Sequence, residues 1–166
     1  MCFFSLIAYD LKASSFMAEP IERQIASAEF ICPILIQETE TRLRGDQVET
    51  LAEVTLIEDC LKGKIEGRFF VLGVGGTYDL KSPHGTQRLT TLVHGAPKLE
   101  KDARLLLYLS ATDEKSVYSL SSWQSLRLNS DGKILWTENG KNPQAEPPAD
   151  LPKNLTEFRQ RYSLKN

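Results

Sequence analysis

Residues 30–57 read FICPILIQETETRLRGDQVETLAEVTLI, and this stretch decides the fold. Two runs rich in aliphatic and β-branched residues, Phe30–Leu43 and Val48–Ile57, flank the dipeptide Gly45-Asp46. A type II′ turn requires glycine at its first central position, and such a turn joins two strands through a two-residue loop. The stretch therefore predicts a long antiparallel hairpin.

The turn also sets the register of this hairpin and assigns each side chain to a face. Arg44 opposes Gln47 across the turn, and two residues earlier Arg42 opposes Glu49. One face is then mainly apolar and the other mainly charged, as in a half-buried ribbon. The apolar face holds Leu35, Leu43, Val48, Val54 and Leu56, with Thr39, Thr41, Thr50 and Ala52 between them. The charged face holds Glu38, Glu40, Arg42, Arg44, Glu49 and Glu53, with Leu51 as the apolar exception.

The three cysteines are Cys2, Cys32 and Cys60, and they contain no C-x-x-C pair, so no structural zinc site is expected. On the register of an uninterrupted hairpin, Cys32 and Cys60 point to opposite faces. A disulfide between them needs a one-residue slip or a bulge, so we expect free thiols. Pro33 has no N–H to donate and is expected at an edge or a bulge.

Working outward, residues 19–28 predict a short helix that opens at Pro20. Residues 139–150 carry three prolines and predict a polar linker, after which residues 151–163 form a C-terminal helix that Asp150 caps. Leu155, Phe158 and Tyr162 share one face of that helix, so it is expected to dock on the sheet. The remaining strands are expected at Arg68–Leu72, Gln87–Val93, Ala103–Ser110, Val117–Leu128 and Lys133–Thr137, with turns at His94-Gly95-Ala96-Pro97 and Ser130-Asp131-Gly132.

These elements predict a mainly β fold. A chain of 166 residues fits a single domain, here residues 1–166 with a β-barrel body at about 28–138. Many short strands separated by turns are typical of a barrel or a sandwich, and the bends implied by Pro33 and the glycines favour a closed or partly open antiparallel barrel.

The charge balance argues against nucleic acid as a partner. The formal net charge is −2, whereas a nucleic-acid binder usually carries a positive excess that neutralises phosphates. Lys98, Lys101 and Arg104 form the one local basic patch that keeps single-stranded nucleic-acid binding open as an alternative.

No apolar run reaches the ~20 residues that a membrane-spanning helix needs. Residues 1–18 are expected to pack as a first strand or arm, although residues 2–9 also resemble a short signal-peptide core.

Two loops offer candidate chemistry. Gly73-Val74-Gly75-Gly76 resembles a phosphate loop, but no helix signal follows it, so bulge glycines are the better interpretation. The stretch Thr77–Gly85 is expected to be a loop, in which His84 and Asp79 combine with His94 in the alternative of a metal-dependent enzyme. Two histidines and scattered carboxylates fall short of the three convergent ligands of a catalytic metal.

The other polar and aromatic clusters have structural interpretations. Glu38, Glu40, Glu49 and Glu53 lie beside arginines on one face and predict a solvated charged surface. Tyr118, Trp123 and Trp136 are expected to pack in the core, with an aromatic ligand surface as the alternative. Asn154-Leu155-Thr156 matches a glycosylation sequon within the predicted helix.

A set of short motifs resembles a family of bacterial, mostly extracytoplasmic OB-like β-barrel proteins related in pattern to netrin-like modules and tissue inhibitors of metalloproteases. The motifs are Ile25–Cys32, Val54–Glu58 followed by Leu61-Lys62-Gly63, Gly75-Gly76, and His94-Gly95-Ala96-Pro97 followed by Ala103–Leu109. The resemblance implies an OB-like barrel and an extracytoplasmic or periplasmic location. The Cys-x-Cys start of the inhibitors is absent, so protease inhibition is not implied.

We therefore expect a non-enzymatic binding or structural module that engages a protein or a cell-envelope component. We assign no catalytic, cofactor or metal residues and expect no cofactor. A protein partner is favoured over nucleic acid, and a cytoplasmic location follows instead if the N-terminus is complete as given.

Overall fold

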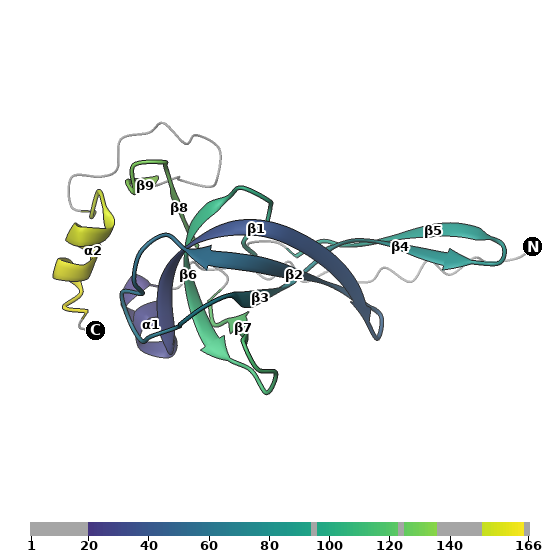
Figure 1. Ribbon diagram of the computed structural model, residues 1–166, viewed down its shortest axis with the longest axis horizontal. Coiled ribbons are helices and arrows are strands. Elements are labelled where there is room, and N and C mark those ends of the chain that lie inside the picture. The colour runs from purple at the N-terminus through teal and green to yellow at the C-terminus, as the bar shows by residue number, and fades with distance from the viewer. Residues whose placement is uncertain (1–19, 94–95, 123–124, 136–150, 165–166) are drawn as a thin grey trace, which may run out of the picture.

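The computed structural model describes residues 20–93, 96–122, 125–135 and 151–164. In these residues a curved β-sheet closes on itself, two short helices lie toward one end of the molecule, and a two-stranded arm projects from the other end (Figure 1). The elements in chain order are α1 (Ile21–Ser27), β1 (Phe30–Arg44), β2 (Gln47–Leu56), β3 (Phe69–Val74), β4 (Gly76–Ser82), β5 (Gly85–Thr91), β6 (Arg104–Ala111), β7 (Val117–Leu120), β8 (Leu126–Leu128), β9 (Ile134–Leu135) and α2 (Leu155–Arg161).

Five strands form a ring in the order β1–β2–β3–β7–β6, because β6 pairs with β1 as well as with β7. The neighbouring pairs of the ring are antiparallel except β3 and β7, which run parallel. Strands β8 and β9 extend the sheet beyond β6. The expectation of a mainly β fold with a closed or partly closed sheet is confirmed, with one parallel pair where only antiparallel pairs were expected.

The hairpin of β1 and β2 has the predicted turn and register near its tip. Arg44 opposes Gln47 and Arg42 opposes Glu49. Gly45 adopts a φ of +64°, the left-handed conformation that the first central residue of a type II′ turn needs. The register predicted from the turn is therefore confirmed at this end of the hairpin.

A β-bulge at Gln37 changes the register of the same hairpin farther from the turn. Glu38 opposes Glu53, but Ile36 opposes Val54, so Gln37 is one extra residue in β1. Because side chains alternate between faces, the extra residue moves Ile36 onto the inner face with Val54. The prediction that Leu35 lies on that face was therefore wrong: Ile34 and Ile36 are fully buried, and Leu35 is only half-buried.

The two described cysteines are joined beyond the end of the β1–β2 ladder. Strand β2 ends at Leu56, the chain meets β1 again at the Ile31–Lys62 bridge, and here Cys32 and Cys60 form a disulfide with a Cα–Cα distance of 4.1 Å. Both residues are buried in the interior of the ring. The expectation of free thiols was wrong because it continued one uninterrupted register to Cys60, whereas β1 has an extra residue at Gln37 and its ladder with β2 ends at Leu56.

Pro33 lies neither at a sheet edge nor at the bulge. It opposes Leu106 of β6, immediately before the ladder with β2 begins at Ile34. Its carbonyl accepts a hydrogen bond from the N–H of Ile57 at 2.9 Å. The proline thus occupies the point where β1 passes from one partner strand to the other.

Strand β6 is buried on both faces and separates two apolar clusters. Leu105, Leu107 and Leu109 point into the ring, where they meet residues from β1, β2 and β3. Leu106 and Tyr108 point outward and are covered by both helices, β8 and β9. The outer cluster consists of Ala28, Ile31, Leu61, Leu106, Tyr108, Leu128, Ile134, Leu155 and Phe158. The central, strongly apolar strand expected at Ala103–Ser110 is confirmed.

The C-terminal helix docks as predicted but begins later. Leu155 and Phe158 are buried in the outer cluster, and the Tyr162 ring lies 4.7 Å from that of Phe158. Asn154 is the N-cap, because its side chain accepts a hydrogen bond from the N–H of Glu157. The prediction that Asp150 caps the helix was wrong in its position, and Asp150 itself lies outside the described residues.

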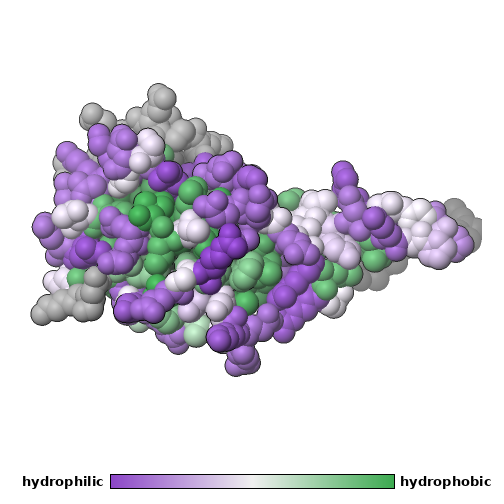
Figure 2. All heavy atoms as spheres, in the orientation of Figure 1, coloured by the Kyte–Doolittle hydropathy of each residue, from purple (hydrophilic) through white to green (hydrophobic). Residues whose placement is uncertain are grey.

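Strands β4 and β5 form a separate two-stranded sheet, which is the projecting arm in Figure 1. The predicted loop Thr77–Gly85 is instead strand β4 followed by a turn at Pro83 and His84. Most of the arm carries polar residues, whereas apolar residues are concentrated on the body (Figure 2). The predicted strand Gln87–Val93 corresponds to β5 and belongs to this arm rather than to the ring.

The predicted strand Val117–Leu128 is two strands. Strand β7 pairs with Leu109–Ala111 and β8 pairs with Leu105 and Leu106, so both lie along the edge of β6 that faces away from β1. The predicted arm at residues 1–18, the linker at 139–150, Trp123 and Trp136 lie outside the described residues.

Candidate functional site

The glycine run predicted as bulge glycines marks the place where the chain leaves the ring and enters the arm. Gly75 and Gly76 adopt φ values of +104° and +129°, which only glycine tolerates readily. The carbonyl of Gly75 accepts a hydrogen bond of 2.7 Å from the Thr50 hydroxyl, and its N–H donates to the Val48 carbonyl. The run therefore bends the chain, and β4 follows it directly instead of the helix that a phosphate loop needs.

The start of the arm is held against the β1–β2 hairpin by threonine hydroxyls. Thr41 donates to the carbonyl of Thr77 at 2.8 Å. The hydroxyl of Thr91, at the end of β5, accepts a bond from the N–H of Val48 at 3.1 Å. These bonds fix the direction in which the arm leaves the body.

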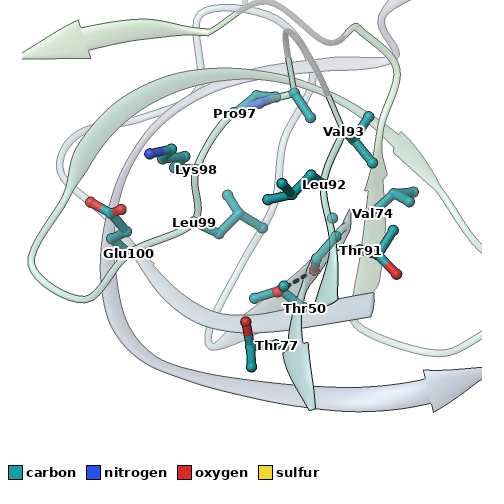
Figure 3. A pocket seen from close by; sticks show the side chains of 14 residues that line it. Thr50, Val74, Thr77, Thr91, Leu92, Val93, Pro97, Lys98, Leu99 and Glu100 are labelled. Atoms are coloured by element: carbon teal, nitrogen blue, oxygen red, sulfur yellow. Dashed lines mark hydrogen bonds between the residues drawn. The ribbon is translucent and has the colours of Figure 1, made fainter. Parts of the chain in front are cut away.

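An open groove of about 560 Å³ lies where β3, the start of β4, the end of β5 and the segment 96–100 meet. Figure 3 shows Leu92 and Leu99 directed toward each other across it. Leu92 is 85% exposed and Val74 is 43% exposed, and these two are the exposed large apolar residues of the described chain. The lining consists of Thr50, Gly73–Thr77, Thr91–Val93 and Ala96–Glu100.

Leu99 packs closely on Gly73 at the floor of the groove. A Cβ on Gly73 would lie 2.8 Å from Leu99 Cδ1, so a larger residue here would require the Leu99 side chain to shift. Strand β7 pairs with β3 only up to Leu72, so the edge of β3 at Gly73 and Val74 has no strand partner among the described residues. The groove therefore combines apolar side chains with an open strand edge.

Charges of both signs stand at the rim. Lys98 and Glu100 lie on the same side of the groove (Figure 3). The site is thus an apolar depression with a mixed polar rim, which suits a protein surface or an extended peptide better than a polyanion.

Two of the three residues of the metal-dependent alternative, Asp79 and His84, lie in the described arm. Asp79 binds Arg88 with two hydrogen bonds, of 2.8 and 3.1 Å, and the Arg88 guanidinium thereby lowers the pKa of that carboxyl. His84 lies in the turn at the tip of the arm, and His94 lies outside the described residues. In the described part of the chain no three His, Cys, Asp or Glu side chains are grouped so that they could hold a metal ion.

The basic patch of the nucleic-acid alternative is partly neutralised. Lys101 forms an ion pair with Glu38, and this hydrogen bond raises the pKa of the lysine. Lys98 lies at the groove, and Arg104 begins β6 next to the closing contact with β1. The three cations therefore do not present one uninterrupted positive surface.

The carboxylates of the hairpin mostly pair with cations. Glu49 accepts from Arg42 at 3.1 Å and lies 3.6 Å from Arg44, and it is only 8% exposed rather than solvated as expected. Glu53 pairs with Arg68 at 3.2 Å. These contacts support the interpretation of this face as a charged outer surface of the sheet.

Tyr118 packs between two phenylalanines in the ring. The aromatic ring of Tyr118 makes edge contacts with those of Phe30 and Phe69, at centroid distances of 5.3 and 5.4 Å. The predicted core role of this aromatic residue is confirmed.

Sequence reasoning missed the groove, because its lining comes from segments that lie far apart in the chain. The local signals were the glycine run and Leu92, an isolated large apolar residue after a polar strand. In comparisons with family models, curated proteins and solved structures, nothing matches this chain. Neither helix in the described residues has the length and apolar character that crossing a membrane requires.

Proposed function

We propose that this chain is a non-enzymatic OB-like barrel that binds an extended segment of a protein partner in the groove at the start of the arm. The five-strand ring supports the OB-like assignment, because an OB-fold is a five-stranded Greek-key barrel that binds its ligands across one sheet face and the adjoining loops. The resemblance of the short motifs to extracytoplasmic OB-like proteins points the same way.

The observation that carries the proposal is the exposure of Leu92 and Val74 beside an open strand edge. A side chain as apolar as leucine gains roughly 1.5–3 kcal/mol when it is fully buried, and Leu92 is 85% exposed. An extended peptide can bond to the edge of β3 at Gly73 and Val74 while its apolar side chain covers Leu92 and Leu99. Strand addition of this kind derives affinity from main-chain bonds and specificity from side-chain pockets.

The buried disulfide supports an extracytoplasmic or periplasmic location for this binding. Disulfides persist in oxidising compartments and are rare in the reducing cytosol. The Cys32–Cys60 bond lies in the interior of the ring, so it is a structural bond of the folded barrel. The partner is therefore expected among proteins of the cell envelope or outside the cell.

Site-specific photo-cross-linking tests the groove. In one variant of the full chain a photoreactive phenylalanine analogue replaces Leu92. In a second variant, the control, the same analogue replaces the exposed Lys115. We expect a discrete cross-linked protein from position 92 in the native host, absent from position 115 and lost when Val74→Glu adds a charge to the groove. The proposal would be contradicted if positions 92 and 115 gave the same cross-linked products, or if Val74→Glu left the products from position 92 unchanged.

A further inference from the structure

The outer edge of β4 is an unpaired strand edge on a projecting arm. In the described residues β4 pairs only with β5, and these two strands form their own sheet (Figure 1). An isolated two-stranded hairpin is only marginally stable in water, and open edges invite pairing with another strand. None of the residues 78–82 lines the groove, so this surface is distinct from the proposed peptide site.

The ends of the free edge are well defined. At Thr77 the edge is covered by β1, because the Thr77 carbonyl accepts from the Thr41 hydroxyl at 2.8 Å. At the other end the strand stops at Ser82, where the two-residue turn at Pro83 and His84 begins. The free edge therefore consists of the five residues from Tyr78 to Ser82.

The backbone groups on this edge belong to the two charged residues. In an antiparallel ladder, alternate residues direct both their N–H and their C=O groups to the partner or away from it. Because the Thr77 carbonyl points away from β5, the backbone groups of Asp79 and Lys81 also point away from it. Tyr78, Leu80 and Ser82 bond to β5 instead.

The side chains of this segment alternate between two faces. Tyr78 and Leu80 lie on one face, together with Leu89 of β5. Asp79 and Lys81 are exposed on the other face, next to Arg88. The segment therefore carries one negative charge, one apolar residue at its centre and one positive charge.

We infer that this edge pairs with the same edge of a second copy of the chain. Residues 78–82 are centred on Leu80, so an antiparallel copy places Leu80 opposite its counterpart and Tyr78 opposite Ser82. In that register Asp79 of each copy opposes Lys81 of the other, and these are the residues whose backbone groups point outward. Residue i of one copy then contacts residue j of the other and j contacts i, as two-fold symmetry requires.

The charges select this register over the nearest competitor. A shift of two residues keeps the same backbone groups opposed but places Asp79 directly opposite its counterpart. Like charges opposed across strands are destabilising, whereas opposite charges favour the pairing. The register centred on Leu80 contains two opposite-charge pairs, and every residue of the free edge has a partner in it.

The contact is small, so the dimer is expected to dissociate on dilution. Stable interfaces bury about 1,200–2,000 Å² in total, and five residues on each side supply less than that. We therefore expect a monomer–dimer equilibrium that sedimentation velocity resolves over protein concentrations from the micromolar to the millimolar range.

Charge reversal tests the pairing in the full chain. Lys81→Glu places two acidic residues opposite each other at both ends of the contact, and Asp79→Lys does the same with basic residues. Each variant alone is expected to sediment as a monomer at concentrations where the unaltered chain dimerises. Lys115→Glu makes the same charge change at an exposed position away from the arm and is expected to leave the dimer intact.

Mixing the two variants separates lost pairing from lost folding. In the mixture, both acidic side chains of the Lys81→Glu protein stand opposite the two lysines of the Asp79→Lys protein. We expect the mixture to form a heterodimer although neither component dimerises. A monomeric unaltered chain at every concentration, a dimer insensitive to Lys81→Glu, or a mixture without heterodimer would overturn the inference and leave the edge to a strand of another protein.

Discussion

At the scale of single residues, Tyr108 is the least satisfied group of the outer cluster. It is buried between β6 and the helices, and its hydroxyl has no hydrogen-bond partner in the described chain. A buried polar group without a partner costs roughly 1–3 kcal/mol. Burial also raises the pKa of Tyr108 far above its ordinary value of 10.0, because the phenolate would lose its solvation.

We expect Tyr108→Phe to increase the free energy of unfolding by about 1 kcal/mol, since it removes the unpaired hydroxyl and keeps the ring. The gain should grow above pH 10, the ordinary pKa of tyrosine. There the unfolded natural chain releases the proton, whereas the folded chain retains it, so the natural chain loses stability as the pH rises. Urea unfolding at neutral pH measures the gain in stability. Urea unfolding at a pH about half a pH unit above the ordinary tyrosine pKa measures how far this gain has grown.

Tyr118→Phe is the matched control, because Tyr118 is also an aromatic residue of the sheet but has a half-buried position. An equal gain from both substitutions would show that the gain does not arise from the buried hydroxyl of Tyr108. A loss of about 1 kcal/mol or more from Tyr108→Phe would show that this hydroxyl has a partner in solution.

At the scale of elements, helix α2 has only seven residues and relies on packing rather than on its own propensity. Phe158 is fully buried against the sheet. We expect Phe158→Ala to lower the free energy of unfolding by about 3–5 kcal/mol, and Asn154→Ala, which removes the N-cap, by about 1 kcal/mol.

Gln160→Ala changes an exposed residue of the same helix and serves as the control. Denaturant unfolding followed by circular dichroism gives the three values. If Phe158→Ala were no more destabilising than Gln160→Ala, the helix would not be docked on the outer cluster in solution.

The elements show what the sequence could and could not predict. The β1–β2 turn was predictable because Gly45 has a local conformational role, and β6 was predictable because its leucines form a continuous apolar run. The bulge at Gln37 was not predictable, because no glycine or turn residue marks it; it lies just after the residues of β1 that pair with β6 as well. Strand β4 of the arm was predicted as a loop because its few apolar residues, Tyr78 and Leu80, do not form a buried strand pattern.

The candidate site was less predictable than the fold. Gly73 was singled out for its glycine neighbours, but its closeness to Leu99 depends on a segment that is distant in the chain. Leu92 carries no motif, and only its exposure in the folded chain marks it. Sites formed by separated segments leave no spacing pattern to read.

At the scale of the whole molecule, the Cys32–Cys60 bond closes a loop with a sequence separation of 28 that contains most of β1 and all of β2. Linking residues at this separation stabilises a protein by roughly 3–4 kcal/mol, chiefly by restricting the unfolded chain. We expect Cys32→Ala with Cys60→Ala to lower the free energy of unfolding by about this amount. Both cysteines are also expected to resist alkylation in the folded protein.

Urea unfolding of the natural and doubly substituted chains measures the stability difference, with Cys2→Ser in both so that no third thiol interferes. Mass spectrometry after alkylation, with and without denaturant, counts the accessible thiols. Rapid labelling of Cys32 and Cys60 in the non-reduced, folded chain would contradict the bond.

The extra residue at Gln37 sets the phase of β1, that is, which of its side chains face the interior of the ring. A substitution in β1 alters one side chain. Deleting Gln37, in contrast, would reverse the inward or outward direction of every β1 side chain on one side of the deletion. On the pairing with β2, Ile34 and Ile36 would then leave the inner face that they share with Val54. For this strand, therefore, the length of the segment between the disulfide and the turn is as strict a requirement as the identity of its residues.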